Sequence, residues 1–305
     1  QSKEEIVNIF SAAGLNNFIR CPYSFLLDKG WGLGDGKVME EQAGAPEIGS
    51  FIHDCLSNFI DKHLNAKLDY EKLDELTEEM DAVFDEVWQD YLEKGKVNDS
   101  PLWQADKNRM RKQLQNWLKF EAKLQAEWSF LPFATELEFK KKDAVPLELS
   151  DKTQVKVHGA IDRLDESNQQ IFITDYKTGA TPNQTDIYAG NDMQTNVYLL
   201  AAKEKYPDKE VAGIGYYQLK ALERKPNLFF TDTGTLNLPG VSAPKKVTML
   251  SKEQFEDLAK NNIIKTIESI YQGKFVPTGR DCSYCSYNEI CRKVEGLPAE
   301  VKEDG

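Results

Sequence analysis

Two extended runs decide the fold of this chain, VKVHGAID at residues 155–162 and IFITDYK at residues 171–177. The residues between them, Leu164–Gln170, are polar and rich in turn formers, so the two runs are predicted to form an antiparallel β-hairpin. Side chains alternate faces along a strand, which places Asp175 and Lys177 on the same face as the two isoleucines of the second run. Two charged groups that end a buried strand are costly unless something binds there.

The charged residues of the hairpin can form a hydrolytic site. Asp162 ends the first run and can be brought across the hairpin towards Asp175. Two close carboxylates repel each other unless a hard divalent cation lies between them. Lys177 would lie beside that cation, where it could orient a water molecule or stabilise a developing negative charge. The alternative is an ordinary surface hairpin in which Lys177 forms a salt bridge with Asp175.

A downstream helix supports the hydrolytic interpretation. Residues 193–200 are predicted to be helical, and Gln194 and Tyr198 lie one turn apart on one face of that helix. An earlier helix at residues 47–64 places His53 at the edge of an apolar stripe. A solvated or capping histidine is the simpler interpretation of His53, but beside a carboxylate pair it becomes a candidate metal ligand.

Four segments in this order resemble the PD-(D/E)XK nuclease superfamily in its RecB-like branch. They are GSFIH at 49–53, GAIDR at 159–163, DYKTG at 175–179 and Gln194-x3-Tyr198. The resemblance implies a DNA nuclease, with an exonuclease as the expected type, that depends on Mg²⁺ or Mn²⁺.

The resemblance also implies roles for individual residues. The metal would be held by His53, Asp162, Asp175 and the backbone carbonyl of Tyr176. Lys177 would position water or offset phosphate charge. Gln194 and Tyr198 would order the site or touch the nucleic-acid backbone. Arg163 is expected either to contact phosphate or to form a salt bridge with the acids that follow it, Asp165 or Glu166.

The five cysteines predict a second metal site. Cys282, Cys285 and Cys291 have the spacing of a metal-cluster loop, and Cys21, at a Pro-marked turn, is the best candidate for a fourth ligand. Cys55 falls on an apolar helix stripe and is predicted to be a core residue. Disulfides are disfavoured by the odd number of cysteines, whereas a four-cysteine zinc site remains open.

The same spacing resembles the iron–sulfur nucleases of the AddB type, in which one upstream cysteine and a C-x2-C-x5-C motif bind a [4Fe-4S] cluster. Such a cluster would join the two ends of the chain across a loop of about 260 residues, with a stabilisation on the order of 4–5 kcal/mol by analogy with disulfides.

The charge of the chain counts against DNA binding. The formal net charge is −12 in 305 residues, whereas phosphate binding favours a basic surface. Much of the acid falls in residues 69–93, and basic clusters occur separately at 107–112 and 140–142. The acidic balance therefore weakens the nuclease interpretation without removing it.

The expected architecture is α/β: a restriction-endonuclease-like mixed β-sheet flanked by helices. We expect one domain at residues 1–296, with a helical insertion at about 65–130, cluster-binding segments at about 15–25 and 280–292, and an acidic tail at 297–305. The tryptophans at helical spacing are predicted to be core residues rather than base-stacking ones.

The sequence also predicts the location of the protein and its binding partners. No leader and no stretch of membrane-spanning length is visible, which predicts a cytoplasmic protein. The chain opens on Gln1 and is expected to be a piece of a longer polypeptide. Its expected partner is DNA, in repair or recombination, with a helicase subunit or domain as a possible second partner. The rival interpretation is an inactive nuclease fold that serves as a DNA-binding scaffold.

Overall fold

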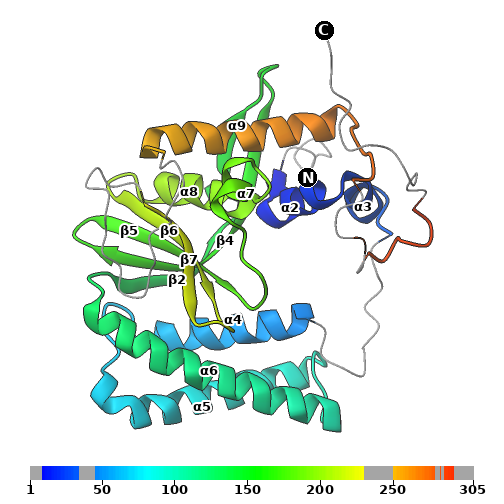
Figure 1. Ribbon diagram of the computed structural model, residues 1–305. Helices are drawn as coiled ribbons and strands as arrows, with labels where there is room; N and C mark the ends of the chain where they lie inside the picture. Colours follow the sequence, from blue (N-terminus) through cyan, green and yellow to red (C-terminus); the bar gives the residue numbers. More distant parts are fainter. Residues whose placement is uncertain (1–8, 34–44, 230–249, 279–281, 283–284, 292–305) are drawn as a thin grey trace.

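A computed structural model describes residues 9–33, 45–229, 250–278, 282 and 285–291 (Figure 1). The loop expected at residues 34–44 and the expected acidic tail at 297–305 lie outside the described residues. The centre of the described part is a seven-stranded mixed sheet built around one long strand, β4, which pairs with β1, β2, β3 and β5. The strands are β1 (Ile9–Ser11), β2 (Leu131–Phe139), β3 (Val145–Glu148), β4 (Gln154–Ser167), β5 (Gln170–Lys177), β6 (Glu210–Gln218) and β7 (Glu223–Phe229).

The predicted hairpin is present, but its turn is shorter than expected. Strand β4 continues to Ser167, and only Asn168 and Gln169 form the turn, with φ of 47° and 65°. Two consecutive positive φ angles are typical of the tight turns that join antiparallel strands. The prediction of a polar turn over Leu164–Gln170 was therefore wrong. Arg163 and Asp165 lie inside the strand because other charges neutralise them there.

Strand β5 is the inner strand next to β4, and it pairs on its other side with β6 in parallel. A parallel pair needs a crossover connection, and helices α7 (Gln184–Tyr188) and α8 (Met193–Lys205) supply it. All residues of β5 except the first and last are buried, as is usual for a strand covered on both faces.

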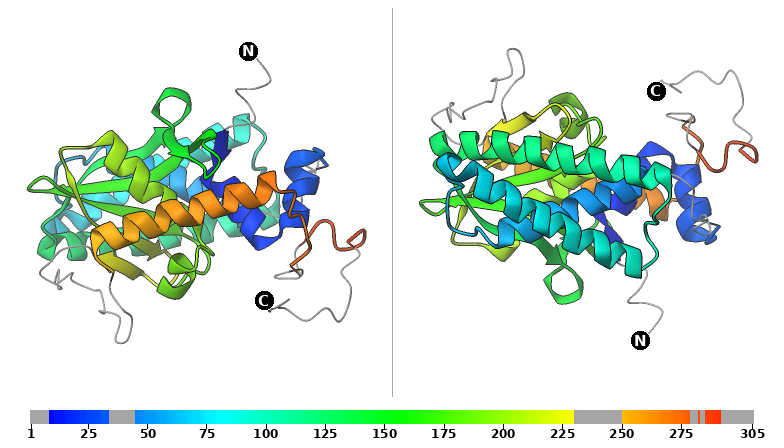
Figure 2. Two further views of the ribbon diagram at one scale, coloured as in Figure 1. Left: turned by 90° about the horizontal axis from the view of Figure 1, so that it is seen from above. Right: turned by 90° about the horizontal axis from the view of Figure 1, so that it is seen from below.

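Helices cover both faces of the sheet (Figures 1 and 2). On one side lie α2 (Ala12–Arg20), α8 and α9 (Lys252–Tyr271); on the other lie α4 (Ala45–Asp61), α5 (Leu73–Glu93) and α6 (Pro101–Glu127). The remaining helical segments are short: α3 (Pro22–Phe25), and the turns Leu26–Gly30, Tyr70–Lys72 and Lys141–Asp143. This mixed sheet between helical layers confirms the predicted fold class. None of the described helices combines the length and apolar character that a bilayer crossing requires.

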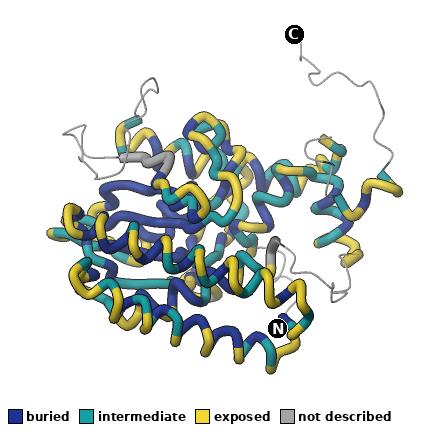
Figure 3. The backbone as a smooth tube through the Cα atoms, turned by 60° about the horizontal axis from the view of Figure 1, so that its bottom comes forward, coloured by how far each residue is buried: buried dark blue, intermediate teal, exposed yellow. Residues whose placement is uncertain are grey.

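Local sequence signals explain where several helices begin. Ser251 and Gln254 form the predicted capping box at the start of α9. Ser100 caps α6, which carries proline in its first turn. Helices α5 and α6 bury their apolar stripes against α4 and expose their other faces (Figure 3). Four predicted core tryptophans are almost fully buried: Trp88, Trp103, Trp117 and Trp128.

A buried group of charges joins the α6 layer to the sheet. Arg163 of β4 has no solvent exposure and forms ion pairs with Asp165 at 2.7 Å and with Glu121 of α6 at 2.8 Å. Arg224 of β7 approaches the same Glu121 carboxylate at 3.3 Å. Burial alone would raise the pKa of Glu121, but the two guanidinium groups outweigh it and lower that pKa to about 2.

We predict that Glu121→Gln destabilises the protein by about 3–5 kcal/mol at pH 7, because it leaves buried arginine charge uncompensated. Folding lowers the pKa of Glu121, so its ionised carboxylate stabilises the folded protein fully at pH values above the ordinary pKa of glutamate. This stabilisation is lost as pH falls towards about 2. The gap in unfolding free energy between wild type and variant should therefore shrink between roughly pH 4.5 and 2. Urea titrations at several pH values measure it, with exposed Glu127→Gln as the matched control. A constant gap would contradict the prediction.

Candidate functional site

The two predicted carboxylates meet where β4 and β5 separate from each other. The hairpin register pairs Arg163 with Thr174, so Asp162 and Asp175 occupy the next position along the two strands. Asp162 accepts a hydrogen bond from the backbone N–H of Tyr176 at 2.7 Å. Both carboxylates are buried, with 9% exposure for Asp162 and 2% for Asp175. Burial, and then the charge of Asp162, raise the pKa of Asp175 to about 7.

Lys177 is held in one position by two partners. Its ammonium group lies 2.7 Å from a carboxylate oxygen of Asp175 and donates a hydrogen bond to Oε1 of Gln194, also at 2.7 Å. Burial would lower the pKa of Lys177, but Asp175 outweighs it and the net shift is upward. Lys177 therefore stays protonated near neutral pH and acts as a fixed cation rather than as a base.

The predicted pair on the downstream helix joins this network. The amide nitrogen of Gln194 donates to the hydroxyl of Tyr198 at 3.1 Å, so Lys177, Gln194 and Tyr198 form a continuous chain of hydrogen bonds. The start of α8 is fixed by Asp192, whose side chain accepts from the N–H of Thr195. Asn16 of α2 in turn bonds both Asp192, at 3.2 Å, and the N–H of Met193, at 2.6 Å. The first turn of α8 is therefore anchored to a distant part of the chain.

His53 reaches the site from α4. Its Nδ1 lies 3.4 Å from Asp162 Oδ2. Burial would lower the pKa of His53, but the hydrogen bond and charge of Asp162 outweigh it and raise that pKa to about 9. The simpler sequence interpretation, a solvated histidine, is wrong: the side chain is only 26% exposed and is directed at the carboxylates.

Glu136 of β2 is a site residue that sequence reasoning missed. One ligand atom each from His53, Glu136 and Asp162 lie within 4.8 Å of one another. Burial, and then the charge of Asp162, raise the pKa of Glu136 to about 7. Its φ of 42° is unusual for a residue inside a strand, and such strain is found at functional sites. Only the β2–β4 register, which sets Glu136 opposite Asp162, could have revealed it.

Together these side chains form an acidic group whose ligand atoms could hold a hard divalent cation. Carboxylate oxygens are the ligands that Mg²⁺ and Mn²⁺ prefer, and a neutral imidazole is compatible with Mn²⁺. The pKa of about 9 for His53 belongs to the metal-free site, so His53 would release its proton when it binds a metal. Among the described residues around Asp162 and Asp175, the raised pKa values of Asp175 and Glu136 indicate that the acids outnumber the fixed positive charge of Lys177. A divalent cation would relieve that repulsion.

Arg163 does not contribute to the surface of this site. It is fully buried in the ion-pair group with Glu121 and Asp165, and its Nη1 also donates to the Tyr176 hydroxyl at 3.1 Å. The expected phosphate contact by Arg163 was therefore wrong, and the alternative of a salt bridge to Asp165 is confirmed.

The segment before Cys282 and the helices around Cys21, which carry the predicted cluster ligands, lie beside each other. Thr278 donates a hydrogen bond to the carbonyl of Arg20 at 2.8 Å, directly before Cys21, and Tyr287 bonds Asp28. The path after α9 runs along the helices at the start of the chain (Figure 1). Cys21, Cys282, Cys285 and Cys291 are all partly buried, whereas Cys55 is fully buried in the core as predicted.

The chain is similar to several bacterial proteins, each named as a subunit of an ATP-dependent helicase/deoxyribonuclease. The protein of Clostridium acetobutylicum is 26% identical, over 92% of this chain and 29% of its own length. The protein of Clostridium kluyveri is 25% identical, over 96% of this chain and 31% of its own length. The protein of Pelotomaculum thermopropionicum is 30% identical, over 64% of this chain and 17% of its own length. The chain thus spans less than a third of these relatives.

A family model matches most of the chain, from residue 9 to residue 292. This span contains all four motif segments and the cysteines of the predicted cluster. The mixed sheet and the arrangement of Asp162, Asp175 and Lys177 agree with the match. The chain belongs to the PD-(D/E)XK nuclease superfamily.

Proposed function

We propose that this protein is a metal-dependent DNA nuclease, of exonuclease type, that hydrolyses phosphodiester bonds. The observation that carries the proposal is the convergence of His53, Glu136, Asp162 and Asp175 around one edge of β5, with Lys177 fixed beside them. Asp175 is buried and Glu136 is exposed, but both have raised pKa values, and acids perturbed in this way cluster at functional sites.

His53, Asp162, Asp175 and the carbonyl of Tyr176 would hold Mg²⁺ or Mn²⁺, and Glu136 offers one further oxygen ligand. A bound divalent cation would polarise a phosphate oxygen and lower the pKa of a bound water. Asp162 is already oriented by the N–H of Tyr176, so the ligand set needs little rearrangement.

Lys177 would act on the phosphate as a fixed positive charge. Its contacts with Asp175 and Gln194 restrict the ammonium to one place, where it can stabilise charge that develops in the transition state. Gln194 and Tyr198 would position Lys177 rather than take part in proton transfer. The Tyr198 hydroxyl, whose pKa is raised by burial and by Asp175, stays protonated.

A [4Fe-4S] cluster held by Cys21, Cys282, Cys285 and Cys291 is the proposed structural cofactor, with Zn²⁺ as its alternative. The contact of Thr278 with Arg20 supports it, because it brings the segment before Cys282 against the residue before Cys21. The packing of Phe18 on Phe275, with ring centroids 6.2 Å apart, brings the same two segments together.

The wider role follows from the relatives. A helicase subunit or domain is the proposed partner and DNA repair or recombination the proposed process, because the similar proteins are named as helicase/deoxyribonuclease subunits. Residues 1–296 are proposed to form one cytoplasmic nuclease domain with a helical insertion at about 65–130. The rival proposal of an inactive DNA-binding scaffold is disfavoured, because loss of activity usually removes an acid or the lysine. Asp162, Asp175 and Lys177 are all present, with Lys177 paired to Asp175 and Asp162 bonded to the N–H of Tyr176.

We predict that Asp175→Asn abolishes DNA cleavage in Mg²⁺ without unfolding the protein. Folding raises the pKa of Asp175, so ionised Asp175 destabilises the folded state above its ordinary pKa. The metal-free variant should therefore melt no lower than wild type at pH 8, and the rise in Tm on adding Mg²⁺ should be lost. Gel assays of labelled DNA with and without EDTA, together with melting curves, measure both effects. Exposed Asp208→Asn is the control, and full activity of Asp175→Asn would refute the site.

We predict that Lys177→Arg lowers kcat by roughly 100-fold, about the loss that follows removal of one transition-state donor. Arginine keeps the charge but replaces a compact ammonium with a planar fork that does not fit between Asp175 and Gln194. The rise in Tm with Mg²⁺ should persist, since Lys177 is not a metal ligand. A variant with wild-type kcat would mean that Lys177 supplies only bulk charge.

We predict that protein purified without oxygen contains about four iron atoms per chain. Cys21→Ala should lose the iron and lower Tm, because metal binding and folding are coupled when distant segments supply the ligands. Cys55→Ala should keep the iron, with only the cost of a small core truncation. Elemental analysis and melting curves test this. Stoichiometric zinc would replace the cluster with a zinc site, and loss of metal in Cys55→Ala alone would overturn the ligand set.

A further inference from the structure

The basic segment at residues 107–112 is divided between two faces of α6. Arg111 turns towards α5 and pairs with Asp81, at 3.1 Å, and with Asp85. Lys107 turns the same way, 3.8 Å from Asp85 and 4.7 Å from the centre of the Trp88 ring. These two cations neutralise the acidic helix α5 and have no role on the opposite side of α6.

The other two basic residues of this segment, Arg109 and Lys112, line a pocket on the side of the sheet. This pocket has a volume of about 370 Å³ and lies between α6 and the connection from β6 to β7. Its lining residues are Arg109, Lys112, Gln113, Asn116, Leu219, Lys220 and Leu222, none of which is acidic. Arg109 is 67% exposed and pairs with Asp106 of its own helix at 2.6 Å. We name this hollow the α6 pocket.

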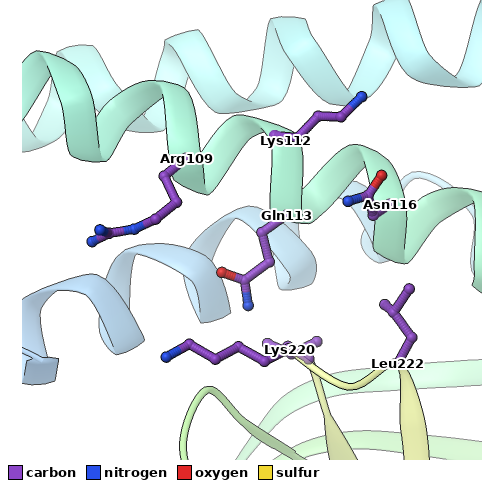
Figure 4. Close-up of a pocket in the computed structure, with 7 residues that line it drawn as sticks. Arg109, Lys112, Gln113, Asn116, Lys220 and Leu222 are labelled. Atoms are coloured by element: carbon purple, nitrogen blue, oxygen red, sulfur yellow. The ribbon is translucent and has the colours of Figure 1, made fainter.

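Gln113 gives the α6 pocket an unused hydrogen-bonding group. Figure 4 shows its amide extending from α6 towards Lys220, while the side chain of Lys112 points away from both. The Nε2 atom of Gln113 is buried and has no hydrogen-bond partner among the described residues. Such a group has a cost that a ligand can remove.

The α6 pocket is connected directly to the proposed catalytic strand. The N–H of Leu219, a lining residue, donates to the carbonyl of Lys177 at 2.9 Å. Trp117, which follows the lining residue Asn116, packs against the Tyr176 ring with centroids 6.3 Å apart. The α6 pocket therefore lies at the end of β5 that carries Lys177, on the α6 face of the strand, whereas the Lys177 side chain contacts Gln194 of α8.

We propose that the α6 pocket binds a backbone phosphate of the DNA substrate, away from the bond that is cleaved. Lys220 and Arg109 would supply the positive charge and Gln113 a neutral donor, a combination suited to a phosphate oxygen. An acidic protein segment offers similar charge. DNA is favoured because the wall of the pocket is hydrogen-bonded to the strand of Lys177. This proposal rests on the proposed nuclease function.

The test is a salt titration of DNA binding. A fluorescein-labelled oligonucleotide is bound in EDTA, which prevents cleavage, between about 50 and 200 mM salt. The double variant Arg109→Gln/Lys220→Gln should bind roughly tenfold more weakly at low salt, and the slope of log K against log salt should fall by about 1–2. In Mg²⁺ the same variant should show a raised KM and an unchanged kcat. Lys119→Gln, which removes one exposed charge elsewhere on α6, should match wild type within about twofold.

Gln113→Leu separates binding from a structural role. Leucine has a similar volume and leaves no buried polar atom unsatisfied, so Tm should be unchanged or higher. DNA affinity should nevertheless fall, by about two- to tenfold for one neutral hydrogen bond. A lower Tm with unchanged DNA affinity would show that Gln113 is structural and would overturn its part in the pocket.

The outcomes distinguish this proposal from the nuclease function itself. If wild type cleaves DNA and the double variant matches its affinity, salt slope and KM, the pocket proposal is wrong and the nuclease function stands. If wild type neither binds nor cleaves DNA, both are wrong. A third outcome is that wild type binds poly-glutamate, whereas the double variant does not bind it but still binds DNA normally. The pocket would then bind an acidic protein segment, and the proposal would be overturned.

Discussion

The geometry of the site depends on the buried ion pair between Arg163 and Glu121. Arg163 contacts Glu121 on α6, Asp165 on its own strand and the hydroxyl of Tyr176 on β5. Because side chains alternate along a strand, fixing Arg163 on one face of β4 fixes its neighbour Asp162 on the other face. Fixing Tyr176 does the same for its two neighbours on β5, Asp175 and Lys177. One charged group on the α6 side thus sets the position of three site residues on the opposite side.

The distribution of charge resolves the conflict between a net charge of −12 and an anionic substrate. The acid of α5 lies on the outer helical layer, where α6 meets it with Lys107 and Arg111. The acids of the site are a second, separate group, which a divalent cation can neutralise. The α6 pocket, by contrast, is lined by Arg109, Lys112 and Lys220 and by no acidic residue. Net charge describes the whole molecule, whereas phosphate binding depends on the charges within about one Debye length of the site.

The sequence predicts which candidate site residues lie together better than it predicts their surroundings. Asp162, Asp175, Lys177, Gln194 and Tyr198 lie in short segments with fixed spacing, and the strand and helix that carry them follow from local periodicity. The turn of the hairpin was misplaced because Arg163 and Asp165 are polar, and only the distant Glu121 makes their burial possible. Glu136 was missed for a similar reason, since its role depends on the β2–β4 register and on a backbone conformation that no local pattern encodes. Both errors therefore arose because the environment of these residues depends on segments that are distant in the sequence.

The same electrostatics link cation binding to stability. Burial and mutual repulsion raise the pKa values of both Asp175 and Glu136 to about 7, so their ionised forms are less favourable in the folded chain than in the unfolded one. These two acids therefore oppose folding increasingly as pH rises from their ordinary pKa values to about 7, and other interactions, among them the Arg163–Glu121 and His53–Asp162 pairs, must offset that cost. A cation that binds the folded state removes the repulsion and adds its own binding free energy. Two of the acids proposed to hold the cation are thus unfavourable in the folded chain without it, a cost of the kind expected where a binding site trades stability for function.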